Sequence, residues 1–105
     1  MQEIDPDAFA AAHSAGAYVI DVREAEEYVA GHVPGARFAP LFHLASAVPQ
    51  LPSTEPVYVI CASGNRSKAA AGMLRRAGVD AYSVAGGTAA WARAGRPLVP
   101  GMRER

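Results

Sequence analysis

The sequence has very little cysteine and no excess of either charge. Among its 105 residues there is one cysteine, Cys61, and the ten lysines and arginines balance the ten aspartates and glutamates. A single cysteine cannot form an internal disulfide, so a reducing cytoplasm is the expected setting. Because the formal charge is zero, we expect no nucleic-acid partner and no electrostatic attachment to a membrane surface.

Long hydrophobic runs and metal-ligand spacings are also missing. Residues 1–16, MQEIDPDAFAAAHSAG, contain acidic side chains early and no uninterrupted apolar segment. They therefore predict neither a secretory signal nor a membrane span. His13, His32 and His43 are scattered along the chain, and one cysteine does not complete a zinc site. We expect no metal and no cofactor.

What the sequence does contain is a regular alternation of apolar runs and helical stretches. Half of the residues are hydrophobic, which is enough to bury one core in a chain of this length. The alternation favours an α/β fold around a parallel sheet. The expected strands are residues 17–21, 36–39, 57–61 and 81–84, with a short edge strand at residues 2–4. We expect one domain over residues 1–100 and a short flexible tail at residues 101–105.

Helix boundaries are indicated by capping residues and by apolar spacing. Asp5 before Pro6 is typical of an N-cap and a first helical position. After Cys61, apolar residues at positions 70, 73, 74 and 77 have the spacing of one helical face, and Gly78 should end that helix. The expected helices are residues 5–16, residues 24–30, a weaker segment at residues 41–48, and the stretch between Cys61 and Gly78.

Three polar or glycine-rich segments directly follow expected strands, at residues 21–24, 61–67 and 85–88. In open parallel sheets, ligands bind beyond the carboxyl ends of the strands. These segments are therefore expected to line one pocket. The alternative is that each is a tight turn rich in glycine and polar caps.

The segment CASGNRS, residues 61–67, has the features of an anion-binding loop. Gly64 lets the backbone curl, so that the amides from Ala62 to Ser67 can point inward, while the following helix directs its positive end at the sulfur. Arg66 adds a formal positive charge. An ordinary thiol titrates at about pH 8.5, and such an environment lowers the pKa. The sequence thus predicts a reactive thiolate at Cys61.

Three segments together resemble the rhodanese family. DVREAEEYVAGHVPGA, residues 21–36, is similar to its first signature, CASGNRS to its active-site loop, and VAGGTAAW, residues 84–91, to its carboxyl-terminal signature. Their order and spacing strengthen the resemblance, which spans residues 4–100. It implies a single rhodanese domain with a three-layer fold, in which helices cover both faces of a mainly parallel five-stranded sheet.

The resemblance also implies a sulfurtransferase of the thiosulfate sulfurtransferase type. A small anionic sulfur donor, thiosulfate or a persulfide, would give its outer sulfur to the nucleophile Cys61, and the resulting persulfide would pass it to an acceptor. The acceptor could be a thiol, cyanide or a sulfur-carrier protein. The implied substrate-binding residues are Ala62, Ser63, Gly64, Asn65, Arg66 and Ser67.

Several other residues are expected to support the site. Asp21 and Arg23 should form a buried ion pair that steadies neighbouring loops. Two interpretations of Arg66 stay open, namely attraction of an anionic donor and bracing of the loop. Thr88 is expected to be an N-cap, and Trp91 to belong to the core.

Three other functions remain as alternatives. Phosphatases and arsenate reductases of a related fold have a loop one residue longer than the four residues that separate Cys61 from Arg66 here, and the shorter loop suits a sulfur atom better than a phosphate. A catalytically weak protein-interaction module would usually lack the cysteine. A redox sensor would need a resolving thiol from another molecule.

Overall fold

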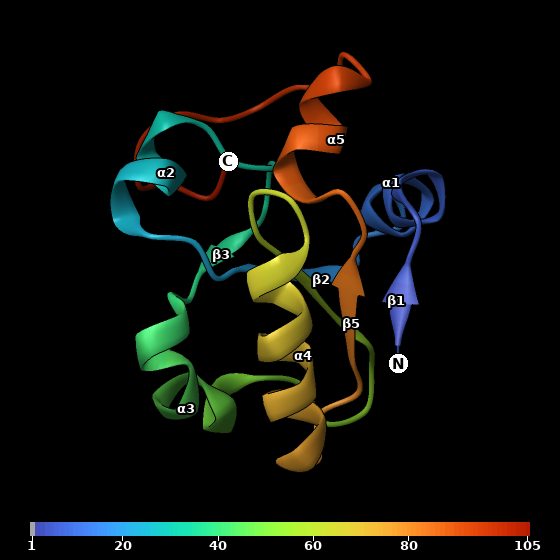
Figure 1. The fold of residues 1–105 in the computed structure, drawn as a ribbon, viewed down its shortest axis with the longest axis vertical. Coiled ribbons are helices and arrows are strands. Elements are labelled where there is room, and N and C mark those ends of the chain that lie inside the picture. Colours follow the sequence, from blue (N-terminus) through green and yellow to red (C-terminus); the bar gives the residue numbers. More distant parts are fainter. Residues whose placement is uncertain (1) are drawn as a thin grey trace.

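The computed structural model describes residues 2–105 and contains one five-stranded parallel sheet (Figure 1). Its order is β1-β5-β4-β2-β3, and every neighbouring pair is parallel. The predicted α/β fold and all five predicted strand positions are confirmed. The strands are β1 (Glu3–Ile4), β2 (Tyr18–Asp21), β3 (Arg37–Phe38), β4 (Val57–Ile60) and β5 (Ala81–Val84).

Helices α1 to α4 connect successive strands and α5 follows the last one, and the first two helices begin at capping residues. Asp5 accepts a hydrogen bond from the main-chain NH of Ala8 at 2.8 Å, as its predicted N-cap role requires. Glu24 and Glu27 form a reciprocal capping box at the start of the second helix. The helices are α1 (Pro6–Ser14), α2 (Ala25–Ala30), α3 (Leu44–Ala47), α4 (Asn65–Arg76) and α5 (Gly87–Arg93).

The segment predicted as one helix at residues 41–48 is broken into three short pieces. A 3₁₀ turn, η1 (Leu41–His43), precedes α3, and a second one, η2 (Val48–Gln50), follows it. Pro49 lies within η2 and has no NH with which to continue an α-helical ladder. Within residues 2–105, no helix is long and apolar enough to cross a membrane.

The core lies in two parts, one on each face of the sheet. On one face Ile20 and Val59 pack with Leu74 of α4, which lies in front of the sheet in Figure 1. On the other face Phe9 of α1 and Trp91 of α5 pack together. Both faces are therefore covered, as the apolar runs in the strands predict. Trp91 is a core residue, as expected.

Residues 101–105, for which we expect a flexible tail, form hydrogen bonds with the rest of the chain. The main-chain NH of Gly101 donates to the carbonyl of Val29, and that of Gly35 donates to the carbonyl of Glu104 at 2.7 Å. A ring nitrogen of His32 lies 2.7 Å from the carbonyl oxygen of Arg103. These residues thus lie against the last turn of α2 and the turn that follows it, and they supply partners for polar groups there.

Candidate active site

The three loops beyond the carboxyl ends of β2, β4 and β5 meet as expected. The main-chain NH of Val22 donates to the carbonyl of Ile60 at 3.0 Å. The NH of Thr88 donates to the carbonyl of Cys61 at 2.8 Å. A groove of about 410 Å³ is lined by residues from all three segments, among them Arg23, Ala62 and Thr88. The three segments therefore lie together and line one groove, as expected.

Cys61 lies immediately after β4, and its sulfur accepts hydrogen bonds from the loop that follows. The main-chain NH of Gly64 is 3.1 Å from Sγ, and that of Ser67 is 3.3 Å away. Gly64 has a φ of 106°, a left-handed conformation that glycine adopts at little cost. This curl turns the two NH groups inward, as the sequence predicts. The Cys61 residue is only 1% exposed.

The pKa of Cys61 results from two opposing effects. Burial raises the pKa of the thiol because it disfavours the charged form. Hydrogen bonds from the Ser67 hydroxyl and from the main-chain NH groups of Ser67, Gly64 and Ser63 lower it. The hydrogen bonds outweigh the burial, so the pKa lies below its ordinary value. The loop thus stabilises a thiolate.

A second serine extends this network into the core, and the sequence reasoning missed it. The Ser67 hydroxyl lies 3.4 Å from the sulfur of Cys61 and 2.7 Å from the hydroxyl of Ser83 on β5. Both serines are fully buried. When Ser67 donates its one proton to the thiolate of Cys61, the bond between the two serines must be donated by Ser83 to Ser67. The available signal was a serine within a strand whose two faces are both covered.

Thr88 does not act as the predicted N-cap. Helix α5 begins at Gly87 with Gly86 as its N-cap, because these two glycines have positive φ values of 74° and 56°. The Thr88 hydroxyl instead donates to the carbonyl of Cys61 at 3.1 Å. A Cβ at position 87 would lie 2.4 Å from that carbonyl oxygen. Only glycine allows α5 to approach the cysteine loop so closely.

Asp21 and Arg23 form the expected buried ion pair. A terminal nitrogen of Arg23 lies 2.9 Å from Oδ2 of Asp21, and Nε lies 3.0 Å from Oδ1. The same terminal nitrogen donates to the carbonyl of Gly31 at 2.8 Å. The pair therefore joins the end of β2 to the end of α2, and its hydrogen bonds hold the backbone.

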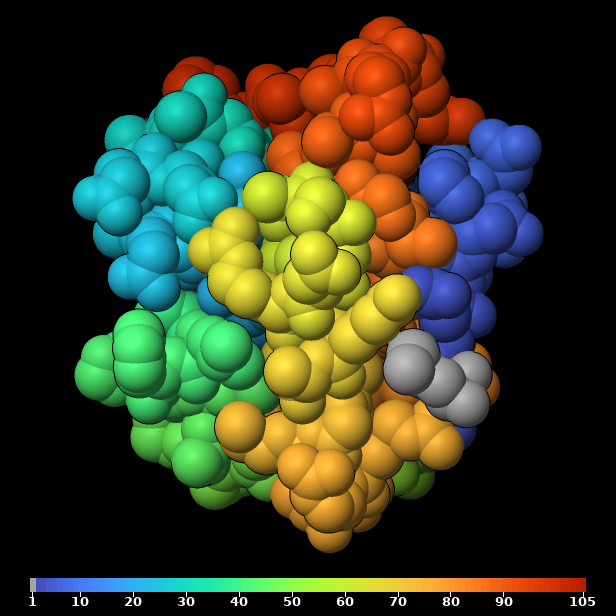
Figure 2. Space-filling model, in the orientation of Figure 1, coloured from blue at the N-terminus to red at the C-terminus, as the bar shows by residue number. Residues whose placement is uncertain are grey.

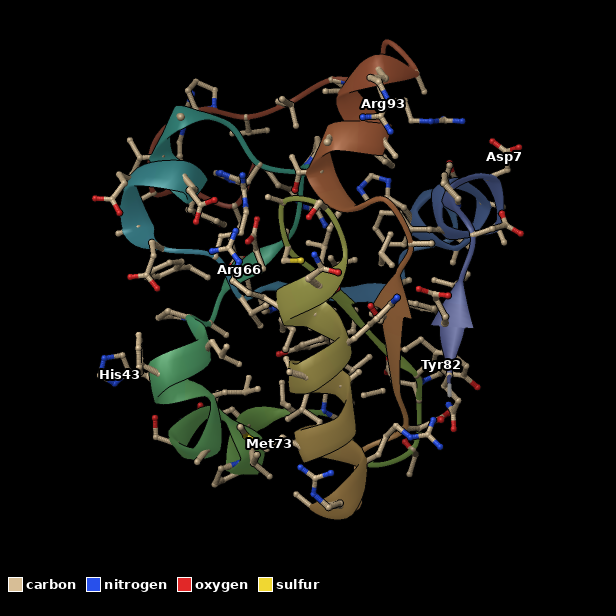
Figure 3. All side chains as sticks on the ribbon, in the orientation of Figure 1. Asp7, His43, Arg66, Met73, Tyr82 and Arg93 are labelled. Atoms are coloured by element: carbon tan, nitrogen blue, oxygen red, sulfur yellow. The ribbon has the colours of Figure 1, made fainter. Side chains whose placement is uncertain are left out.

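Arg66 is bound to a carboxylate. Its two terminal nitrogens lie 2.7 and 2.9 Å from the two carboxylate oxygens of Glu27, and Figure 3 shows Arg66 near the α2 side of the loop. These hydrogen bonds lower the pKa of Glu27 to about 2. Of the two interpretations of Arg66, the contact to Glu27 corresponds to bracing of the loop. Glu27 was not among the predicted site residues.

The remaining predicted site residues lie on the outer part of the loop. Ala62 is half-buried, and its carbonyl accepts a hydrogen bond from the NH of Ala89 at 3.0 Å. Ser63 and Asn65 are exposed, and Asn65 is the first residue of α4. In residues 2–105 no group of three histidine, cysteine or acidic side chains is arranged to hold a metal ion.

Known proteins resemble this chain over most of its length. A family model described as Rhodanese-like domain matches residues 5–94. A thiosulfate sulfurtransferase, GlpE of Pseudomonas fluorescens, is 35% identical over 92 residues, which are 87% of this chain and 84% of that protein.

The crystal structure of a rhodanese-related protein from Thermoplasma volcanium is 30% identical, with a TM-score of 0.87, and the match covers 98% of this chain and 100% of that one. A rhodanese-like domain protein from Staphylococcus aureus is also 30% identical, with a TM-score of 0.82 and coverage of 87% and 91%. With its signature loop, its parallel sheet and these relatives, the chain belongs to the rhodanese-like domain family.

Proposed function

We propose that this protein is a sulfurtransferase that carries a sulfane sulfur on Cys61. In the first half-reaction the Cys61 thiolate attacks the outer sulfur of the donor. The sulfur–sulfur bond of the donor breaks, and its electron pair leaves with sulfite or with a thiolate. In the second half-reaction an acceptor attacks the outer sulfur of the Cys61 persulfide, and the Cys61 thiolate is regenerated.

The observation that supports this proposal best is the set of hydrogen-bond donors on the sulfur. Two main-chain NH groups and one hydroxyl converge on Sγ at 3.1 to 3.4 Å. Fixed donors of this kind stabilise negative charge without reorganising during the reaction. Both the resting thiolate and the persulfide bear such a charge. The loop is thus suited to a sulfur that alternates between these two forms.

The other loop residues have supporting roles in the proposal. The inward-facing amides between Ala62 and Ser67 would hold the outer sulfur during transfer. The Asp21–Arg23 pair would act at a distance, because its hydrogen bonds hold the backbone next to the site. The donor would be thiosulfate or a persulfide, and the acceptor a thiol, cyanide or a sulfur-carrier protein. We place the reaction in a reducing compartment such as the cytoplasm, because Cys61 must return to a thiolate after each cycle.

The proposal is tested by intact mass measurement after incubation with a sulfur donor. We expect one added sulfur atom on the wild-type chain and none on Cys61→Ser. Cyanide should then remove that sulfur and release thiocyanate. If neither thiosulfate nor an organic persulfide produces the adduct, sulfur transfer is wrong and a protein-interaction module becomes the better hypothesis. Cys61-dependent hydrolysis of an aryl phosphate would instead support a phosphatase.

A further inference from the structure

The cationic side chains next to Cys61 are all close to carboxylates. Arg23 is paired with Asp21 at 2.9 Å, Arg66 with Glu27 at 2.7 Å, and Lys68 lies 3.8 Å from Glu3. The first two pairs are joined by more than one hydrogen bond each. The formal charges of the three pairs cancel. An anionic donor that approaches the cysteine loop therefore meets no uncompensated cation among these residues.

Glu27 is held in position from its own helix as well as by Arg66. Its Oε1 accepts hydrogen bonds from Arg66 and from the main-chain NH of Glu24 at 3.0 Å. The NH of Glu24 therefore holds the carboxylate at the start of α2, within reach of Arg66. The pKa of about 2 for Glu27 keeps the carboxylate charged at physiological pH.

The groove beside the cysteine loop is mainly apolar where it is not occupied by these pairs. Ala62 of the loop faces a wall made by α2, α5 and the segment after α5. The apolar lining residues are Ala30, Ala62, Ala89, Ala92 and Leu98. Figure 2 shows the loop and the start of α4 between the surfaces of α2 and α5. Such a surface suits a carbon-bearing group better than a sulfonate.

The two classes of donor differ in charge at the moment of attack. With thiosulfate, a thiolate of charge −1 must approach an ion of charge −2, and the products are the Cys61 persulfide anion and sulfite. With a protonated organic persulfide, RSSH, the thiolate attacks a neutral outer sulfur, and the products are the Cys61 persulfide and RS⁻. The repulsion between the reactants is greater in the first reaction, so a free cation beside the loop would accelerate the first reaction more than the second.

We infer that Glu27 is a specificity-determining residue, which neutralises Arg66 and so favours organic persulfides over thiosulfate as sulfur donors. This inference rests on the proposed function, and it narrows the donor class of the same site. The organic group would lie against the apolar groove, while the loop amides receive the transferred sulfur. Arg66 would brace the loop without binding the donor.

The test compares two donors on three proteins. The rate of sulfur loading on Cys61 is measured with thiosulfate and with benzyl persulfide, whose carbon group is uncharged. For Glu27→Gln we expect the ratio of the thiosulfate rate to the benzyl persulfide rate to rise about tenfold, the effect of one freed charge-assisted contact near the surface. Thiosulfate loading of this variant should also decrease more steeply with added salt than that of the wild type. Gln can retain the capping box.

Glu26→Gln is the matched control because Glu26 is an exposed neighbour in α2 and forms no ion pair within residues 2–105. Its donor ratio should stay within about twofold of the wild type, as for a distant surface charge. An unchanged ratio in Glu27→Gln, or an equal rise in Glu26→Gln, would overturn the inference.

The double variant Glu27→Gln/Arg66→Met supplies a second test, because it removes both charges of the pair and leaves no unpaired carboxylate beside the loop. If Arg66 does not bind the donor, this double variant should keep the donor ratio within about twofold of the wild type, the range of a surface substitution. A selective loss of thiosulfate loading in the double variant would show that Arg66 binds thiosulfate despite Glu27, and the inference would be wrong. Failure of both donors to load wild-type Cys61 would instead refute the proposed function itself.

Discussion

Two arginine–carboxylate pairs lie beside the cysteine loop, and they differ mainly in burial. The side chains of Arg23 and Asp21 are 7% and 0% exposed, whereas those of Arg66 and Glu27 are 36% and 32% exposed. A buried ion is costly to leave unpaired, while an exposed ion is readily solvated by water. An arginine–carboxylate pair can therefore be required for folding when it is buried, whereas an exposed pair of the same kind can instead influence the reaction at the cysteine.

The largest effect is expected when the buried pair is broken. Asp21→Ala leaves Arg23 buried without its counter-ion, and we expect a loss of about 3–5 kcal/mol in the free energy of unfolding. Glu27→Gln should cost less than about 1 kcal/mol, since Arg66 can be hydrated and Gln can retain the capping box. Urea unfolding of both variants measures the difference. Equal losses would contradict the distinction between the two pairs.

The backbone contact between α5 and the cysteine loop, like the Asp21–Arg23 pair, lies in the buried part of the site. Gly87→Ala would place a Cβ 2.4 Å from the carbonyl oxygen of Cys61, at a residue with a φ of 56°. We expect a loss of about 3 kcal/mol in the free energy of unfolding, from overpacking and left-handed strain together. Sulfur loading should also slow because the loop must shift.

Gly78→Ala is the control for the strain alone. Gly78 also has a positive φ, 92°, but nothing lies within 4 Å of the position of its Cβ. Its expected loss is about 1 kcal/mol, from the left-handed conformation only. If Gly87→Ala costs no more than Gly78→Ala, the close approach of α5 does not constrain the loop.

Substitutions of Ser67 and Ser83, whose hydroxyls are hydrogen-bonded to each other, perturb the buried part of the site without changing any formal charge. Ser67→Ala removes a hydroxyl that lowers the pKa of Cys61, so the pH midpoint for alkylation of the thiol should move upward. The lost stabilisation of the thiolate should be about 1 kcal/mol, the net value of one hydrogen bond. Ser83→Ala should move the midpoint in the same direction by less, because Ser83 acts only through Ser67.

Iodoacetamide labelling over a pH series measures these midpoints. Ser46→Ala is the matched control, because the Ser46 hydroxyl is exposed and bonds to the carbonyl of His43. Its midpoint should equal that of the wild type. A Ser83→Ala midpoint that does not move would show that Ser67 needs no second hydroxyl to orient it.

Local patterns were sufficient to predict most of the fold and the centre of the site. The strands follow from apolar runs that are buried on both faces, and the inward amides of the Cys61 loop follow from Gly64 and the helix after it. The Asp21–Arg23 pair could also be predicted, since its members lie two residues apart at the end of a strand. Each of these features is determined by residues close together in the sequence.

The features that the sequence did not reveal depend on contacts between distant residues. Ser83 reaches Ser67 only because β5 lies beside β4 and under α4. Glu27 and Arg66 are 39 residues apart and meet because α2 and the start of α4 both lie at the carboxyl ends of the strands. The role of Thr88 was predicted incorrectly because the paired glycines Gly86 and Gly87 begin the helix two residues earlier than a polar cap at Thr88 suggests.

The smallest predicted effect concerns the acid dependence of stability, and it comes from the exposed pair. Folding lowers the pKa of Glu27 from 4.5 to about 2, with the Arg66 hydrogen bonds as the largest cause. A lowered carboxyl pKa stabilises the fold above the unfolded value and loses this contribution as the pH falls from about 4.5 toward 2. The wild type should therefore be more stable than Glu27→Gln at pH 7, but by less than about 1 kcal/mol because solvent screens the pair. Urea unfolding of both proteins between pH 7 and pH 3 should show this difference shrinking with acid. A difference that is constant across this range would mean that the Glu27–Arg66 pair contributes no charge-dependent stability, and that the bracing of the loop depends on the geometry of the hydrogen bonds alone.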